Sequence, residues 1–308
     1  MVTGAQKELF VKRLGRFLPL YFMLLPAAVY YILICYIPMG GILMAFQDFN
    51  FRRGIWGSEW IGLRYFITFF TSYDFPRLLR NTLTIGVIKC IIEFPFPIIL
   101  ALMLNEVKNK GFKRVNQTIS YMPYFMSDVI VVTIMQRLLA PNTGILNSLI
   151  AALGGDPSTF FMMEAKYFYQ LLFSMDLWKG IGYSSIIYLA AISGVDPELY
   201  EAADIDGCGR IKKIWHITLP AIAGTIGILF ILSVGGLISS SYSQILLLRT
   251  PGNMALADTL DLFVVRIGLQ NGQFGYATAV GLVQGLVGLC LVVSANKISR
   301  KYAEVSVW

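Results

Sequence analysis

The stretch Glu201-Ala202-Ala203-Asp204-Ile205-Asp206-Gly207, followed after nine residues by Ile217-Thr218-Leu219-Pro220, is a polar break between two long apolar segments. Local signals in this break predict a helix, a sharp turn and a second short helix. Asp196 can cap the first helix, and Pro197 suits its first position, where no N–H is needed. Gly207 supplies the left-handed residue that ends many helices. The second helix is expected from Arg210 to His216, so we expect an exposed helical elbow.

The composition of the whole chain is typical of a protein embedded in a lipid bilayer. Of its 308 residues, 56% are hydrophobic and 14% are charged, and the mean hydropathy is +0.65. An ordinary soluble domain carries about 25% charged residues. The net charge of +7 is not gathered into a basic run that would indicate nucleic acid. The four cysteines are scattered and His216 is the single histidine, so neither disulfides nor a metal site is expected.

Six apolar segments are long enough to cross a membrane as helices, which need about 20 residues to span ~30 Å of hydrocarbon. Helices are expected because they satisfy their own backbone groups in lipid. The first segment is too long for a signal-peptide core, and no small-residue cleavage site follows it. The expected spans are 19–46, 81–104, 117–139, 167–192, 219–247 and 274–296.

The sequence therefore predicts an all-α integral membrane protein with six transmembrane helices. More lysine and arginine residues lie on the side of the elbow than on the other side, which puts both termini and the elbow in the cytoplasm. The expected parts are an N-terminal tail (1–18), a six-helix transmembrane domain (19–296) that contains the elbow at about 193–218, and a C-terminal tail (297–308).

The elbow resembles the signature loop of the permease subunits of binding-protein-dependent ABC importers. The signature positions match at fixed spacing at Glu201, Ala202, Ala203, Gly207, Ile217, Leu219 and Pro220. Trp60–Leu63 resembles a pattern common in sugar-importer permeases. Other segments are similar to the branch of this family that moves complex oligosaccharides, namely Pro123–Ser127, Pro141–Asn147 and Tyr276–Gly281. The alternative without a coupling role is a solvated loop helix between two spans. The resemblance implies the permease fold, a coupling role for these residues together with Asp206, and residence in the bacterial plasma membrane.

The resemblance also implies partners. It implies a second homologous permease, two copies of an ATPase, and an extracytoplasmic solute-binding protein. ATP and magnesium are expected on the ATPase and no cofactor is expected in this chain, which has no G-x-x-x-x-G-K-[ST] phosphate loop. The chain is therefore expected to be a transporter subunit rather than an enzyme. No nucleic-acid partner is expected.

Polar residues within the spans are candidates for contact with a solute. Ionisable groups in a span are costly and need an explanation. Tyrosine faces stack well on sugar rings and amides pair with hydroxyls. The candidates are Lys89, Glu93, Asp128, Asp176 and Lys179 in spans two to four, and Ser239, Tyr242, Ser243 and Gln244 in span five. Two alternatives stay open: local neutralisation by pairs three or four residues apart, and close helix packing by the small residues.

The leading hypothesis is a pore-forming subunit of an ATP-driven oligosaccharide importer that couples ATP hydrolysis to alternating access. The basic groups Lys89, Arg137 and Lys179 suggest acidic, uronate-containing cargo. One alternative is a permease for a solute other than a sugar. Another is a secondary transporter driven by an ion gradient, which the lack of an internal repeat and of matching broken helices disfavours. An intramembrane enzyme is disfavoured because no Ser-His pair or metal cluster can form within the spans.

Overall fold

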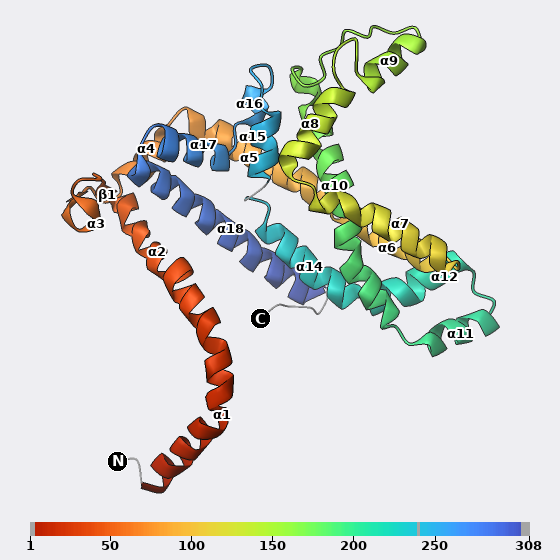
Figure 1. Cartoon of the computed structure of the whole chain (residues 1–308), viewed down its shortest axis with the longest axis horizontal. Coiled ribbons are helices and arrows are strands. Elements are labelled where there is room, and N and C mark those ends of the chain that lie inside the picture. Colours follow the sequence, from red (N-terminus) through yellow and green to blue (C-terminus); the bar gives the residue numbers. More distant parts are fainter. Residues whose placement is uncertain (1–3, 239–240, 303–308) are drawn as a thin grey trace.

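The computed structural model describes the backbone of residues 4–238 and 241–302, and the side chains of residues 17–238 and 241–301. The chain is almost entirely helical. Figure 1 shows a bundle of crossing helices with one long arm that leaves it. The N-terminal half contains α1 (Gly4–Tyr30), a π-helical turn (Tyr31–Tyr36), α2 (Ile37–Met39), a 3-10 turn (Gly40–Phe46), β1 (Gln47–Asp48), α3 (Gly54–Gly57), β2 (Glu59–Trp60), α4 (Arg64–Thr71), α5 (Asp74–Ile92), α6 (Pro95–Glu106), α7 (Lys110–Tyr121), η3 (Met122–Phe125), α8 (Asp128–Leu138) and α9 (Ile145–Ala152).

The C-terminal half contains the longest packed helices. They are η4 (Ala165–Tyr167), α10 (Phe168–Ser193), α11 (Pro197–Ile205), α12 (Arg210–Lys213), the π-helical turn η5 (Ile214–Thr218), α13 (Leu219–Ala221), α14 (Ala223–Gly235), α15 (Tyr242–Leu248), α16 (Met254–Ala257), α17 (Leu260–Val265), a second π-helical turn (Arg266–Gln270) and α18 (Phe274–Tyr302). The strands β1 and β2 pair antiparallel, with Gln47 opposite Trp60. Among the described residues, this small hairpin is the exception to an otherwise helical fold.

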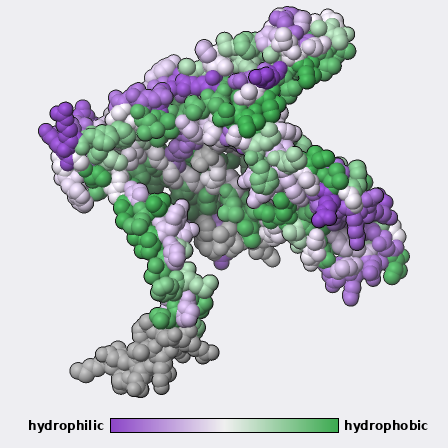
Figure 2. All heavy atoms as spheres, viewed as in Figure 1, coloured by the Kyte–Doolittle hydropathy of each residue, from purple (hydrophilic) through white to green (hydrophobic). Residues whose placement is uncertain are grey.

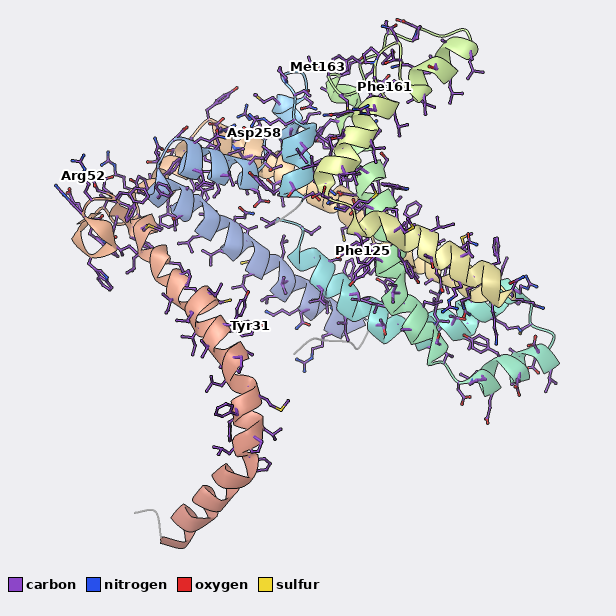
Figure 3. The ribbon with its side chains drawn as sticks, viewed as in Figure 1. Tyr31, Arg52, Phe125, Phe161, Met163 and Asp258 are labelled. Atoms are coloured by element: carbon purple, nitrogen blue, oxygen red, sulfur yellow. The ribbon has the colours of Figure 1, made fainter. Side chains whose placement is uncertain are left out.

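The N-terminal arm, residues 4–39, stands apart from the bundle. The apolar helix from Phe17 to Phe46 is 30 residues long, and 0% of its most apolar stretch is buried within the chain. Figure 2 shows the hydrophobic side chains that cover the described part of the arm, and Figure 3 marks Tyr31, which is 57% exposed. The helix begins at Gly4, inside the stretch predicted as a tail. An apolar helix without packing inside its own chain requires lipid or another subunit around it.

Three hydrophobic clusters hold the bundle together, and α10 contributes to two of them. The first joins α8, α10 and α15 around Leu172 and Ile245. The second joins α4, α5, α17 and α18 around Phe69, and the third joins α6, α10 and the start of α14 around Tyr188. The helices α10 and α7 cross so closely that a Cβ on Gly182 would lie 2.0 Å from the carbonyl oxygen of Ser120. The central position of α10 makes it the axis on which the polar groups described below are arranged.

Spans three and five are broken, so the prediction of continuous helices there was wrong. Span three bends by 102° between η3 and α8, and the first part of span five bends by 65° between α13 and α14. At the first bend Pro123 supplies no N–H, and Ser127 has extended backbone and caps α8 by accepting from the N–H of Ile130. Beyond α14, Ser241 has left-handed backbone (φ 44°), which interrupts the helix again before α15.

By length and composition, the described residues contain three helices that could cross a membrane, or up to five if each bent pair counts as one span. The three are Phe17–Phe46, Asp74–Glu106 and Phe274–Lys301. The helix α10 is 26 residues long, but Asp176, Lys179 and several small residues lower its hydropathy. The count of six spans and the cytoplasmic termini therefore stay predictions.

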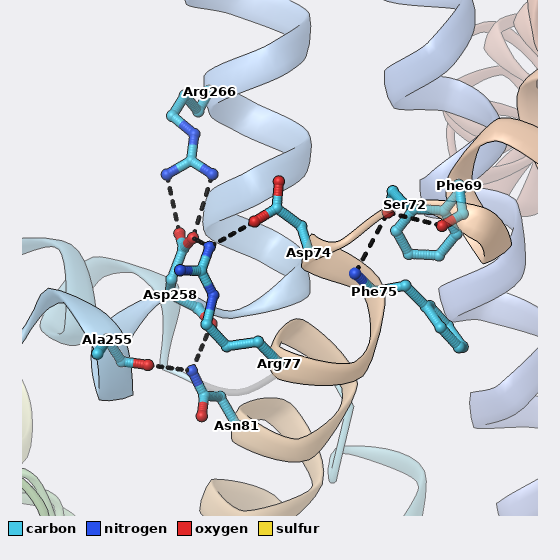
Figure 4. A network of polar contacts seen from close by, with 9 residues as sticks. All are labelled: Phe69, Ser72, Asp74, Phe75, Arg77, Asn81, Ala255, Asp258 and Arg266. Carbon is cyan, nitrogen blue, oxygen red and sulfur yellow. Dashed lines mark hydrogen bonds and ion pairs between the residues drawn. The ribbon is translucent and has the colours of Figure 1, made fainter.

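A buried carboxylate ties the start of α5 to the segment between α16 and α17 (Figure 4). Asp258, whose side chain is 4% exposed, accepts from both terminal nitrogens of Arg266 at 2.9 and 3.1 Å and from Arg77 at 3.1 Å. Asn81 donates to the carbonyl oxygens of Ala255 (2.7 Å) and Asp258 (3.0 Å). Charge-assisted and bidentate bonds of this kind fix geometry strongly. These contacts between the start of α5 and the segment before α17 were not predicted from the sequence, because the residues that form them are distant along the chain.

Candidate functional site

The elbow folds as its sequence predicts. Asp196 accepts a hydrogen bond from the N–H of Glu198 at 3.0 Å and caps α11, with Pro197 at the first helical position. Gly207 has a φ of +71°, the left-handed conformation expected at the end of that helix. The second helix, α12, covers Arg210–Lys213 and continues as the π-helical turn η5. The elbow is therefore a helix–turn–helix segment that connects the end of α10 with the start of α14.

The signature residues divide into an exposed set and an inward set. Glu201, Ala202 and Asp206 are exposed, as is Ile205 between them, which is 88% exposed. Ala203 is 8% exposed and faces its own chain, so it is not part of the exposed face of α11. Ile217 and Leu219 are half-buried, Leu219 against the cluster around Tyr188, while Pro220 is exposed. The exposed set is available to a partner, and the inward set connects the elbow to the bundle.

Two side-chain contacts that the sequence analysis missed brace the elbow. The hydroxyls of Tyr200 on α11 and Thr218 in η5 lie 2.9 Å apart. Lys213 on α12 forms an ion pair with Asp204 on α11. Thr218 is 2% exposed, so its bond is well shielded from water. Because each contact joins α11 to the segment that begins the next span, the two helices of the elbow are braced against each other. The residues of the first contact are 18 positions apart and those of the second are nine apart, so neither contact could be predicted from the spacing of neighbours on one helix.

The ionisable residues in the spans pair mainly between helices. Lys89 on α5 lies 2.5 Å from Asp176 on α10, but 4.0 Å from Glu93 on its own helix. Lys179 on α10 forms an ion pair with Asp128 on α8. The alternative that these charged side chains are neutralised within single helices is therefore wrong as the main explanation of their pairing. Each lysine cross-links two helices of the bundle, because in lipid a charge is stabilised by the partner that tertiary packing supplies.

Polar residues around the break before α15 join this network. Ser241 donates to Asp176 at 3.2 Å and accepts from Lys89. Gln244 donates to Asp128 through Nε2 at 3.4 Å. The residue Ser241 holds a left-handed backbone that is uncommon for anything but glycine, and such strain persists where surrounding contacts fix it. Segments α5, α8, α10 and α15 thus meet at one polar level inside the bundle.

Two cavities adjoin this polar level. The first, here called the Gln244 cavity, has a volume of about 300 Å³. Its wall includes six of the nine solute-path candidates, and the full lining is Tyr124, Asp128, Asp176, Lys179, Gly180, Ser241, Tyr242, Ser243 and Gln244. The second, here called the Glu93 cavity, has a volume of about 350 Å³ and is lined by Lys89, Glu93 and largely apolar residues of α5, α6, α10 and α14. The ninth candidate, Ser239, lies outside the described residues.

Two buried oxygen atoms at these cavities have no hydrogen-bond partner among the described residues. They are Oε1 of Gln244, a residue that is 7% exposed, and Oε1 of Glu93. The orientation of the Gln244 amide follows from Asp128, which can only accept, so the free atom is the acceptor oxygen. Buried polar atoms are seldom left unpaired. The Gln244 cavity places polar side chains beside two tyrosine rings, those of Tyr124 and Tyr242, a set suited to a hydroxylated ligand.

Ala277, Gly281 and Gly285 recur every four residues on α18, and only part of this small-residue face is packed within the chain. Ala277 is 6% exposed, but a Cβ on Gly281 or Gly285 would meet nothing within 4 Å. Gln284 on α18 donates to Asp261 at 2.6 Å and to the carbonyl oxygen of Ile238 at 3.0 Å, and so joins α18 to other elements. The glycine part of this face is open within the chain.

A bundle of long apolar helices with interhelical ion pairs, polar cavities between them and a braced elbow outside defines a membrane transport subunit. The chain matches, over residues 93–304, the family described as the inner membrane component of binding-protein-dependent transport systems. It belongs to this family and is a permease subunit of an ABC importer rather than an enzyme. In this family ATP hydrolysis belongs to a separate subunit.

Relatives cover nearly the whole chain. The chain is 45% identical to the polygalacturonan/rhamnogalacturonan transport system permease protein YteP of Bacillus subtilis, over 94% of this chain and 90% of that protein. It is 42% identical to the protein LplB of the same organism, over 92% and 89% of the two chains. Among solved structures, a crystal structure of a bacterial ABC transporter involved in the import of the acidic polysaccharide alginate contains a similar chain, with a TM-score of 0.88 and 38% identity over 95% of this chain and 99% of that chain.

Proposed function

We propose that the chain is the membrane-spanning, pore-forming subunit of an importer for oligosaccharides, acidic ones among them. The single observation that carries this proposal is the match of nearly the whole chain to permeases of polygalacturonan/rhamnogalacturonan and alginate transport systems. The polar cavity beside Gln244 supports it, because its polar side chains and tyrosine rings suit sugar hydroxyls and ring faces.

Acidic cargo is supported by the relatives rather than by the basic residues within the spans. In this conformation Lys89 and Lys179 are both neutralised by aspartates. Neither lysine is free to receive a uronate carboxylate while these ion pairs stay closed. The third basic group, Arg137, is exposed in the last turn of α8 and is not a member of this network. Recognition of negative charge is therefore assigned chiefly to other subunits or to another state of this one.

We propose that the chain crosses a bacterial plasma membrane six times with both termini in the cytoplasm. The three continuous apolar helices and the two bent pairs account for five crossings, and α10 supplies the remaining one. Figure 1 supports this orientation, since α1 begins and α18 ends on the side of the bundle that carries α11, whereas α9 lies at the opposite end. The exposed face of α11 then lies where a cytoplasmic ATPase can reach it.

The proposed assembly contains a second permease, two ATPase copies with ATP and magnesium, and an extracytoplasmic solute-binding protein. The unpacked N-terminal arm and the open glycines of α18 support a second membrane subunit, because both surfaces are apolar and uncovered. A solved structure of the alginate transporter in complex with its pentasaccharide-bound periplasmic protein, whose similar chain is 37% identical with a TM-score of 0.88 over 96% of this chain and 99% of that chain, supports the solute-binding partner. The coupling role of Glu201, Ala202, Asp206 and their neighbours belongs to this proposal.

A transport assay with the complete complex in liposomes tests the cargo. We expect ATP-dependent uptake of a short oligogalacturonide, and uptake of its neutral methyl ester that is lower by about tenfold, since a tenfold change reflects the loss of roughly one charge-assisted contact. Uptake of the ester at the same rate, or of neutral maltotriose alone, would remove the acidic cargo. No ATP-driven uptake of any oligosaccharide would remove the proposed function itself.

A further inference from the structure

A groove lies between α6 and the turn η5, on the outside of the bundle; it is here called the α6 groove. It has a volume of about 430 Å³ and is lined by Ile99, Leu102, Met103, Glu106 and Ile214. All of these side chains except Glu106 are apolar, and those of Ile99 and Met103 are 48% and 64% exposed. From Ile99 to Glu106 the groove follows α6 for seven residues, about 10 Å. Its length and its lining suit a hydrocarbon chain.

The Glu106 end of the groove lies at the depth of lipid headgroups. Glu106 is the last residue of the apolar helix Asp74–Glu106, whose 33 residues extend for about 50 Å and so exceed the ~30 Å of hydrocarbon in a bilayer. On the other side of the groove, Ile211 is 73% exposed and Trp215, one turn later, is 65% exposed. Tryptophan is enriched at the interface between membrane and water. Both walls of the groove therefore reach this interface.

Two opposite charges lie at this end of the groove. Figure 1 shows α12 beside the end of α6, and there Nε of Arg210 lies 3.9 Å from Oε2 of Glu106. Arg210 precedes the groove residue Ile214 by four positions and therefore lies on the same side of α12. The two charged side chains are 69% and 38% exposed, and 3.9 Å is too long for a direct hydrogen bond. Both charged groups are thus accessible to a ligand.

We propose that the α6 groove binds one phosphatidylethanolamine molecule of the inner leaflet. An acyl chain lies along the apolar wall, the phosphate binds Arg210, and the primary ammonium binds Glu106. The proposal rests on the orientation given in the proposed function and adds a lipid ligand to it. Because the headgroup contacts α6 through Glu106 and α12 through Arg210, the lipid joins the bundle to the elbow. A ligand that binds only the folded arrangement stabilises it.

The chemistry of the two charged groups selects this headgroup among common phospholipids. The planar guanidinium of arginine matches the geometry of a phosphate, and an ammonium group donates charge-assisted hydrogen bonds to a carboxylate. Phosphatidylglycerol has a phosphate but no cation for Glu106. The quaternary ammonium of phosphatidylcholine is a cation but has no N–H to donate. Phosphatidylethanolamine supplies both partners.

Native mass spectrometry of the complete complex, freed of lipid in detergent, tests the headgroup. Phosphatidylethanolamine, phosphatidylglycerol and phosphatidylcholine with the same acyl chains are titrated in turn, and bound lipid is read on this chain after its release in the gas phase. We expect phosphatidylethanolamine to bind at least about tenfold more tightly than the other two lipids, the effect of one charge-assisted contact. Glu106→Gln should abolish this preference. The matched control Glu198→Gln, on α11, should keep it.

A second pair of variants tests the phosphate contact. Arg210→Gln should weaken the binding of all three lipids by about tenfold, because each carries a phosphate. Arg114→Gln, which removes an exposed arginine of α7, should leave binding unchanged. Equal affinity of the unmodified chain for the three lipids, tighter binding of phosphatidylglycerol, or a preference that persists in Glu106→Gln would overturn the proposal. Binding is measured without transport, so a complex that shows the expected preference but imports no oligosaccharide would contradict the proposed function alone.

Discussion

Gly182 lies where α10 and α7 touch backbone to backbone. A Cβ at this position would lie 2.0 Å from the carbonyl oxygen of Ser120, which is far inside van der Waals contact. The neighbouring Gly180, on the same helix, has nothing within 4 Å of its would-be Cβ. Two glycines two residues apart thus have different roles, one in helix packing and one beside the Gln244 cavity.

We predict that Gly182→Ala destabilises the chain by about 1–3 kcal/mol, because overpacking against a backbone oxygen forces the two helices apart. Gly180→Ala should be neutral or stabilising, by up to ~1 kcal/mol, since alanine favours a helix and meets no obstacle here. Thermal unfolding of the two variants in the same detergent measures the difference. Equal melting temperatures would show that the crossing of α7 and α10 is looser than described.

The solute-path residues show what sequence could and could not supply at this scale. The sequence showed that five charged residues within the spans needed an explanation, because charges in a span are costly. They are Lys89, Glu93, Asp128, Asp176 and Lys179. The sequence did not show which of these charges form ion pairs, since the spacing of Lys89 and Glu93 on one helix favours a local pair. The observed pairs join residues 87 and 51 positions apart, and the former brings in Ser241 as well.

The elbow is the element that sequence reasoning described best. Its cap, its first-turn proline and its terminal glycine are local signals, and local signals depend on few distant contacts. The breaks in spans three and five were missed because the apolar composition continues across them. Pro123 and Ser127 marked the first break, while the second depends on the tertiary contacts of Ser241 with Lys89 and Asp176.

We predict that the ion pair of Asp204 and Lys213 maintains the coupling of ATP hydrolysis to transport. Asp204→Lys and Lys213→Asp should each lower the amount of sugar imported per ATP hydrolysed, because like charges push α11 away from α12. The double exchange should restore the ratio, since it rebuilds the pair in reverse. Stability should change by no more than about 1 kcal/mol, as expected of a partly exposed pair.

The matched control for this prediction is Glu198→Lys, a charge reversal on the same helix at a residue without an ion pair among the described residues. This variant should keep the wild-type ratio of import to hydrolysis. If the double exchange were as defective as the single variants, charge on α11 itself, rather than its brace to α12, would govern coupling.

At the scale of the whole molecule, the chain leaves surfaces uncovered that another subunit can cover. The N-terminal arm buries none of its most apolar stretch, and Gly281 and Gly285 of α18 face open space. Hydropathy predicted the arm as a span, but it could not show that the arm would leave the bundle. Membrane helices associate by close packing of small residues and apolar surface. Both features are what a second permease would cover.

The ends of the molecule carry two matched reporters for the central claim that the elbow receives work from an ATPase. Ile205 on α11 and Leu153 beyond α9 are aliphatic side chains that are each 88% exposed. They lie at opposite ends of the bundle in Figure 1, as judged by the helices beside them. A reporter at Ile205 should meet the ATPase, and the same reporter at Leu153 should not.

Site-specific photo-cross-linking in the assembled complex makes this measurement. A photoreactive residue at position 205 should give an adduct with the ATPase subunit, and the adduct should be lost when ATPase subunits are omitted. The same residue at position 153 should give no such adduct. An assembled, transport-competent complex in which position 205 yields no ATPase adduct, or in which position 153 does, would contradict the account.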